Sequence, residues 1–139
     1  MKKTINVLVV EDNEYYNKLL FNALQQSTHF IRKGVEYRLV LHSFISSAEC
    51  IRKIKSAEFI DDNVIAFVDY YMGNGITGSH IINLLKRQNV NAQAVLLSQS
   101  MNIAVKNTLS NHDFFVVKDT FAPALCRLYL DQYIENKFL

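Results

Sequence analysis

The chain has 139 residues, close to the commonest size of one folded domain, so we expect a single domain spanning residues 1–139. Apolar residues make up 50% of the chain and charged residues 20%, which is typical of globular proteins and excludes a disordered or low-complexity chain. The net charge is +2, from 15 basic and 13 acidic residues with no dense basic run. Charge therefore gives no support to nucleic-acid binding.

The N-terminal segment carries no targeting or membrane signal. Two lysines precede a short apolar run, Ile5–Val10, which ends at Glu11 and Asp12. Such a run is too short for a signal peptide or a membrane span. We therefore expect a soluble, cytoplasmic protein without membrane contacts.

Strand-like and helix-like segments alternate along the chain. Short apolar runs rich in β-branched or aromatic residues predict strands, and apolar residues spaced three and four apart predict helices. In chain order, the predicted elements of the first half are a strand at Ile5–Val10, a helix through Tyr16–Leu24, a strand at Tyr37–Phe44 and a helix through Ala48–Ile54, with Phe59 as a further member of its apolar stripe. The predicted elements of the second half are a strand at Val64–Val68, a helix through Ile81–Leu85, a strand at Ala94–Leu97, a short helix at Ile103–Leu109, a strand at Phe114–Val117 and a long helix at Phe121–Ile134. The stretch Gln25–Glu36 is the least periodic, and we interpret it as a connection or an extended end of the first helix.

The alternation predicts the fold class. Strands separated by helices are parallel and are buried on both faces, so they read as continuous apolar runs. We therefore expect a doubly wound α/β domain, with a five-stranded parallel sheet and helices on both faces.

Four charged residues directly follow three of the predicted strands. Glu11 and Asp12 follow the first strand, Asp69 the third and Lys118 the fifth. In a doubly wound sheet the ligand crevice lies at the carboxyl ends of the strands, so these side chains should meet. Three adjacent carboxylates repel one another unless they bind a cation, and oxygen ligands suit Mg²⁺. Taken alone, Glu11 and Asp12 are better explained as the end of a strand and the cap of a helix.

Ser98 ends the fourth predicted strand and brings a hydroxyl to the same edge of the sheet. A hydroxyl and the Lys118 ammonium could both donate to phosphoryl oxygens near Asp69, opposite the metal. The set is consistent with an aspartyl-phosphate site. Taken singly, Ser98 is better explained as a strand end or helix cap, and Lys118 as a solvated surface charge.

The order of these residues resembles a known family. The segments Val7–Glu14, Ala66–Met72, Ala94–Ser98 and Phe114–Lys118 resemble the response-regulator receiver domain of two-component signalling, over nearly the whole chain. The resemblance implies a flavodoxin-like strand order, 2-1-3-4-5. It also implies a phosphoacceptor that assists its own phosphorylation and dephosphorylation rather than an enzyme acting on a separate substrate.

The resemblance implies roles for the site residues. Asp69 is the expected phosphoacceptor. Asp12 is the expected direct Mg²⁺ ligand, Glu11 acts through water, and the backbone carbonyl of Tyr71 completes the protein ligands. The resemblance also implies that Ser98 supplies a switch hydroxyl, that Lys118 supplies the ammonium that contacts the phosphoryl group, and that Phe115 is an aromatic switch.

The resemblance also implies partners. The phosphoryl group would come from a sensor histidine kinase or a histidine phosphotransfer protein, and the signal would pass to a downstream protein. The expected output face comprises the fourth helix, the fifth strand and the last helix. The last helix has too many apolar residues for one stripe, so either both sides pack inside or one side docks a partner or a second copy. Because the chain ends there, we expect a stand-alone receiver without an output domain.

Four positions depart from the family pattern. Gly73 replaces the usual proline in a loop with three glycines in six residues, which should allow positive φ. Gln99 replaces a small residue and should crowd the site, while Asp119 replaces a proline and should compete for Lys118. Phe115 lacks the hydroxyl of a tyrosine, so its positions should differ by packing alone. These changes predict altered phosphorylation kinetics.

Two other functions stay open. A degenerate receiver would act as a binding module independent of phosphate, and the departures favour it. A small phosphohydrolase with Asp69 as nucleophile is the other, but Tyr71 stands where a general-acid aspartate would be needed.

Overall fold

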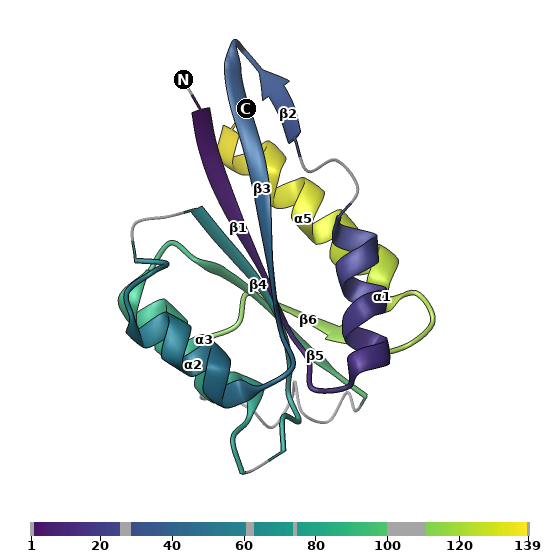
Figure 1. The fold of residues 1–139 in the computed structure, drawn as a ribbon. Helices are drawn as coiled ribbons and strands as arrows, with labels where there is room; N and C mark the ends of the chain where they lie inside the picture. Colours follow the sequence, from purple (N-terminus) through teal and green to yellow (C-terminus); the bar gives the residue numbers. More distant parts are fainter. Residues whose placement is uncertain (1, 26–28, 61–62, 74, 100–110, 139) are drawn as a thin grey trace.

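A computed structural model describes residues 2–25, 29–60, 63–73, 75–99 and 111–138 (Figure 1). Its sheet has six strands in the order β2-β3-β1-β4-β5-β6. The strands are β1 (Lys2–Val10), β2 (His29–Arg32), β3 (Val35–Phe44), β4 (Asn63–Asp69), β5 (Gln93–Ser98) and β6 (Phe114–Val117). All neighbours are parallel except β2, which pairs antiparallel with β3. The five parallel strands therefore have the predicted flavodoxin-like order 2-1-3-4-5, and the predicted fold class is confirmed.

Helices cover both faces of the sheet. They are α1 (Glu14–Leu24), α2 (Ser47–Lys55), α3 (Gly78–Gln88) and α5 (Ala122–Phe138). Figure 1 shows α1 beside α5 on one side of the sheet, and α2 beside α3 on the other. The predicted helix at 103–109 lies outside the described residues. None of the helices in the described ranges combines the length and hydropathy needed to cross a membrane.

The strand β2 corrects the interpretation of Gln25–Glu36. Residues 29–32 form an antiparallel edge strand, and β3 begins at Val35, two residues before the predicted start. Lys33 and Gly34 connect the strands with φ of 50° and 77°, the left-handed pair that tight hairpins require. The prediction was wrong here because four residues are too few to establish a periodicity of two.

The end of α2 is the second difference from the predicted elements. The helix ends at Lys55, and Ala57 has a φ of 61°, which is incompatible with a continuing helix. Phe59 lies beyond that turn and is still buried in the core. Its apolar spacing therefore reports burial rather than helical structure.

The core is divided by the sheet into two layers. Along β1, alternate side chains enter opposite layers: Ile5, Val7 and Val9 face α1 and α5, while Leu8 and Val10 face α2 and α3. This two-sided burial explains why the strand is a continuous apolar run. The sheet thus forms a rigid support whose carboxyl edge positions the polar residues described next.

Candidate functional site

Three carboxylates meet at the carboxyl edge of the sheet. Glu11 and Asp12 directly follow β1, and Asp69 is the last residue of β4. One carboxylate oxygen from each of the three lies within 4.8 Å of the others. They open into a cavity of about 400 Å³, lined by Glu11, Asp12, Asn13, Asp69, Tyr71, Gln99 and Lys118. The predicted convergence of the acids is therefore present in the structure.

Lys118 balances part of this negative charge. It directly follows β6, and its backbone N–H donates to the carbonyl of Ser98 at 2.9 Å, which ties it to the end of β5. Its Nζ lies 2.5 Å from Glu11 Oε1 and 3.4 Å from Asp69 Oδ1. The lysine side chain is only 10% exposed. The ammonium is thus held inside the site rather than solvated at the surface.

Burial governs the charge state of two of the acids. Burial raises the pKa of Glu11 from 4.5 to about 7, although the hydrogen bond from Lys118 opposes the shift. Burial also raises the pKa of Asp69, against the attraction of Lys118. One ammonium does not fully compensate the buried carboxylates, so a bound cation would favour their charged forms.

A buried asparagine fixes the corner between β1 and α1. The side chain of Asn17 is 3% exposed, and its Nδ2 donates to the carbonyls of Glu11 at 3.0 Å and Phe44 at 3.2 Å. Ser43 Oγ donates to Asn17 Oδ1 at 2.6 Å. The backbone N–H of Asn13 donates to Glu11 Oε2 at 3.1 Å. Sequence reasoning missed Asn17, although an amide on the buried face of a predicted helix was a usable signal.

A close backbone contact fixes the loop after Asp69. The N–H of Tyr70 donates to the carbonyl of Leu97, and the N–H of Gly78 donates to the carbonyl of Tyr70, both at 2.8 Å. A Cβ on Gly78 would lie 2.2 Å from the carbonyl oxygen of Asp69. Only glycine allows the start of α3 to approach β4 so closely. Sequence reasoning interpreted Gly78 as a turn residue and missed this contact.

Two other loop glycines behave as predicted. Gly73 and Gly75 have φ of 71° and 74°, the region that glycine adopts without strain. Gly73 also lies beside Asp12, because a Cβ there would be 3.8 Å from Asp12 Oδ2.

The other predicted residues lie at or beneath this edge. Ser98 is the last residue of β5 and is fully buried. Phe115 is half-buried and packs against the core on the α2 and α3 side. Gln99 lines the cavity and is exposed. The Asp119 carboxylate accepts from the N–H of Phe121 at 2.9 Å, so it caps the turn into α5 while the neighbouring lysine points to the acids.

The donor set fits a hard divalent cation. Three carboxylates supply oxygen ligands, as Mg²⁺ requires, and the cavity leaves room for water. Asp12 is exposed at the rim, whereas the Glu11 side chain is 1% exposed and already bonded to Lys118. Asp12 is therefore the carboxylate best placed to reach an incoming ion directly.

The sequence matches no protein-family model and no curated protein sequence. Solved structures do match it. The response regulator DrrB of Thermotoga maritima has a TM-score of 0.72 at 15% identity, and the match covers 96% of this chain and 54% of that one. TrrA of the same organism, in complex with Mg²⁺ and BeF, has a TM-score of 0.66 at 20% identity, covering 93% and 98%. A Burkholderia pseudomallei response regulator with a phosphorylated aspartic acid and a calcium ion has a TM-score of 0.65 at 18% identity, covering 95% and 75%.

The chain therefore has the fold of response-regulator receiver domains over almost its whole length. It spans about half of the full DrrB protein. The acidic cavity lies at the carboxyl ends of the strands, where a doubly wound fold binds its ligands.

Proposed function

We propose that this protein is a phosphoacceptor response regulator of a two-component phosphorelay, which takes a phosphoryl group onto Asp69. The observation that carries the proposal is the meeting of three carboxylates and one buried ammonium in a single cavity. A metal site alone would not require the lysine, and a structural ion pair alone would not require three acids. Both together suit the transfer of an anionic group beside a cation.

The position of each residue in the cavity suggests its role. Asp12, Asp69 and the carbonyl of Tyr71 would hold Mg²⁺, with Glu11 acting through water. The bound ion would supply charge neutralisation for the incoming phosphoryl group. Lys118 would contact phosphoryl oxygens from the opposite side, helped by the Ser98 hydroxyl after a local rearrangement that exposes it.

The transfer itself is an in-line displacement. A carboxylate oxygen of Asp69 forms a bond to phosphorus as the bond between phosphorus and the donor breaks, and the donor leaves with that electron pair. The natural donor would be the phosphohistidine of a sensor kinase or phosphotransfer protein. A phosphorylated acid and a Mg²⁺–BeF complex in proteins of the same fold support this assignment.

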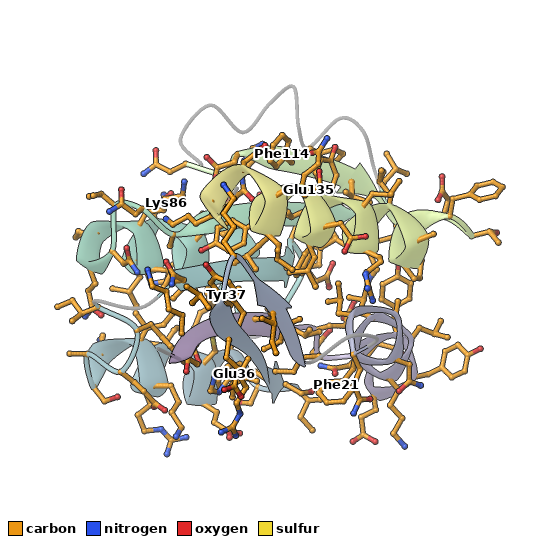
Figure 2. The ribbon with its side chains drawn as sticks, turned by 90° about the horizontal axis from the view of Figure 1, so that it is seen from above. Phe21, Glu36, Tyr37, Lys86, Phe114 and Glu135 are labelled. Atoms are coloured by element: carbon orange, nitrogen blue, oxygen red, sulfur yellow. The ribbon has the colours of Figure 1, made fainter. Side chains whose placement is uncertain are left out.

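The output would be a change in protein contacts. On α5, Cys126 and Leu130 are buried, whereas Leu128 is 60% exposed and Phe121, just before the helix, is 75% exposed. Figure 2 shows Phe114 of β6 beside α5, where its ring stacks on that of Tyr129 with centroids 4.4 Å apart. We propose that β6 and the exposed side of α5 contact the downstream protein or a second copy of the chain.

Labelling by a small phosphodonor tests the function. Wild-type protein should acquire a base-labile phosphoryl group from acetyl phosphate only when Mg²⁺ is present, and Asp69→Asn should abolish the label. Asp113→Asn is the matched control, because Asp113 pairs with Lys86 on another part of the protein. If the wild type stays unlabelled by acetyl phosphate and by any histidine kinase, the phosphoacceptor role is refuted.

One observation favours a degenerate receiver as the second candidate. The 2.5 Å contact between Lys118 and Glu11 gives Glu11, the most buried of the three acids, a partner within the protein that offsets part of its charge. A phosphate-independent binding module needs no more than this. A Mg²⁺ titration followed by tyrosine fluorescence separates the two, since only the phosphoacceptor requires saturable binding at the acidic cavity.

A further inference from the structure

An aromatic ring from α1 lies against the ammonium of Lys118. The Nζ atom is 4.4 Å from the centroid of the Tyr16 ring. Tyr16 is half-buried and packs against the core on the α1 and α5 side. At this distance an ammonium is attracted to the negative face of the ring. The contact thus joins the first turn of α1 to the loop that follows β6.

The ring differs in kind from the other neighbours of Lys118. Glu11 and Asp69 are carboxylates whose charge would be shared with a metal and with a phosphoryl group. The ring is uncharged, so its attraction for the ammonium does not depend on the charge state of the carboxylates. It also covers the ammonium against water, consistent with the low exposure of the lysine side chain.

The hydroxyl of Tyr16 has no visible part in this arrangement. It is buried and has no hydrogen-bond partner within the described part of the chain. The backbone N–H of Tyr16 bonds to Asn13 Oδ1 at 2.9 Å whatever the side chain is. The ring face is therefore the feature that matters, and a phenylalanine would preserve it.

We propose that Tyr16 is a positioning residue that holds the Lys118 ammonium in the acidic cavity, ready for the phosphoryl group. This inference rests on the proposed phosphoacceptor function. Without the ring, the ammonium gains access to water and other side-chain rotamers compete with the inward one. The fraction of molecules with Lys118 in place falls, and the rate of phosphorylation falls with it.

The experiment compares Tyr16→Phe with Tyr16→Leu, each alone and combined with Lys118→Met. The initial rate of phosphorylation by acetyl phosphate at saturating Mg²⁺ is the kinetic readout. We expect Tyr16→Phe to keep the wild-type rate and Tyr16→Leu to lower it by about three- to thirty-fold, the range of a cation–π contact. In the Lys118→Met background the same Leu substitution should change nothing further. Leu41→Ala, which trims another half-buried side chain packed on the same core, controls for general loosening.

A second readout does not depend on phosphorylation. In lysine-labelled protein, the ε-methylene resonance of Lys118 should be shifted upfield by the ring in the wild type and in Tyr16→Phe, and should join the other lysines in Tyr16→Leu. An unshifted wild-type resonance overturns the proposal, as does an equal loss of rate with and without Lys118. If the protein is never phosphorylated, the proposed function fails, while the resonance still decides whether the ring holds the ammonium.

Discussion

Replacing Gly78 with alanine tests the closest backbone contact of the site. The new Cβ would lie 2.2 Å from the Asp69 carbonyl oxygen, 2.9 Å from its carbon and 3.0 Å from Val68 Cγ1. An ordinary contact needs about 3.5 Å, so the start of α3 or the end of β4 must move by about 1 Å. Two of the three obstructing atoms are backbone, which cannot rotate away. Relief therefore has to come from a shift of the backbone, either in α3 or in β4 at Asp69.

The expected change in the free energy of unfolding of Gly78→Ala is the sum of two losses and one gain. Overpacking costs about 1–3 kcal/mol, and loss of the Gly78 to Tyr70 hydrogen bond costs about 1 kcal/mol. Alanine returns at most about 1 kcal/mol through helix propensity, because Gly78 is the first residue of α3. The expected net loss in the free energy of unfolding is about 2 kcal/mol. Propensity alone predicts the opposite sign, so the direction of the change is decisive.

Urea unfolding followed by circular dichroism measures this loss, and a Mg²⁺ titration reports whether Asp69 has moved. Gly75→Ala is the matched control, because its φ is 74° but nothing lies within 4 Å of its Cβ position. That control should lose only the conformational cost, about 1 kcal/mol, and should bind Mg²⁺ as the wild type does. A Gly78→Ala variant as stable as the wild type, with unchanged Mg²⁺ binding, would refute the reasoning.

Three further predictions concern buried polar groups. Asn17→Ala should lower the free energy of unfolding by about 2–3 kcal/mol, because the buried Glu11 carbonyl loses its side-chain donor, the Phe44 carbonyl keeps only the N–H of Glu11, and the Ser43 hydroxyl loses its acceptor. A loss below that of an exposed Asn22→Ala control would contradict this. The pKa of Glu11 is raised to about 7, so below that pH the bound proton opposes Mg²⁺. Mg²⁺ affinity should therefore rise between about pH 6 and 8, and it should rise less steeply in Glu11→Gln. Parallel plots of Mg²⁺ affinity against pH for the two proteins would contradict this. Burial raises the pKa of Cys50 and Cys126 to about 12, so both thiols should react with a disulfide reagent at pH 8 only after unfolding in urea; rapid labelling of folded protein would count against this.

The sequence predicted those features that depend on residue type and order. Strands such as β1 and β4 are apolar on both faces, and the acids stand at their carboxyl ends. Chain order and the doubly wound geometry were therefore enough to bring Asp69 to Lys118. Contacts that depend on the third dimension were missed. Neither the approach of Gly78 to Asp69 nor the ring of Tyr16 against Lys118 has a local signature, because each joins segments that are adjacent only after folding.

The ion pair between Lys118 and Glu11 connects cation binding by the acids with the position of the Lys118 ammonium. The same ammonium is 2.5 Å from Glu11 and 3.4 Å from Asp69, so its shorter and stronger contact is to the acid that is not the proposed acceptor. Anything that draws the charge of Glu11 elsewhere weakens the first contact and favours the second. Cation binding by the acids and the approach of Lys118 to Asp69 should therefore be coupled, with α1 contributing to both through Asn17 and the ring of Tyr16.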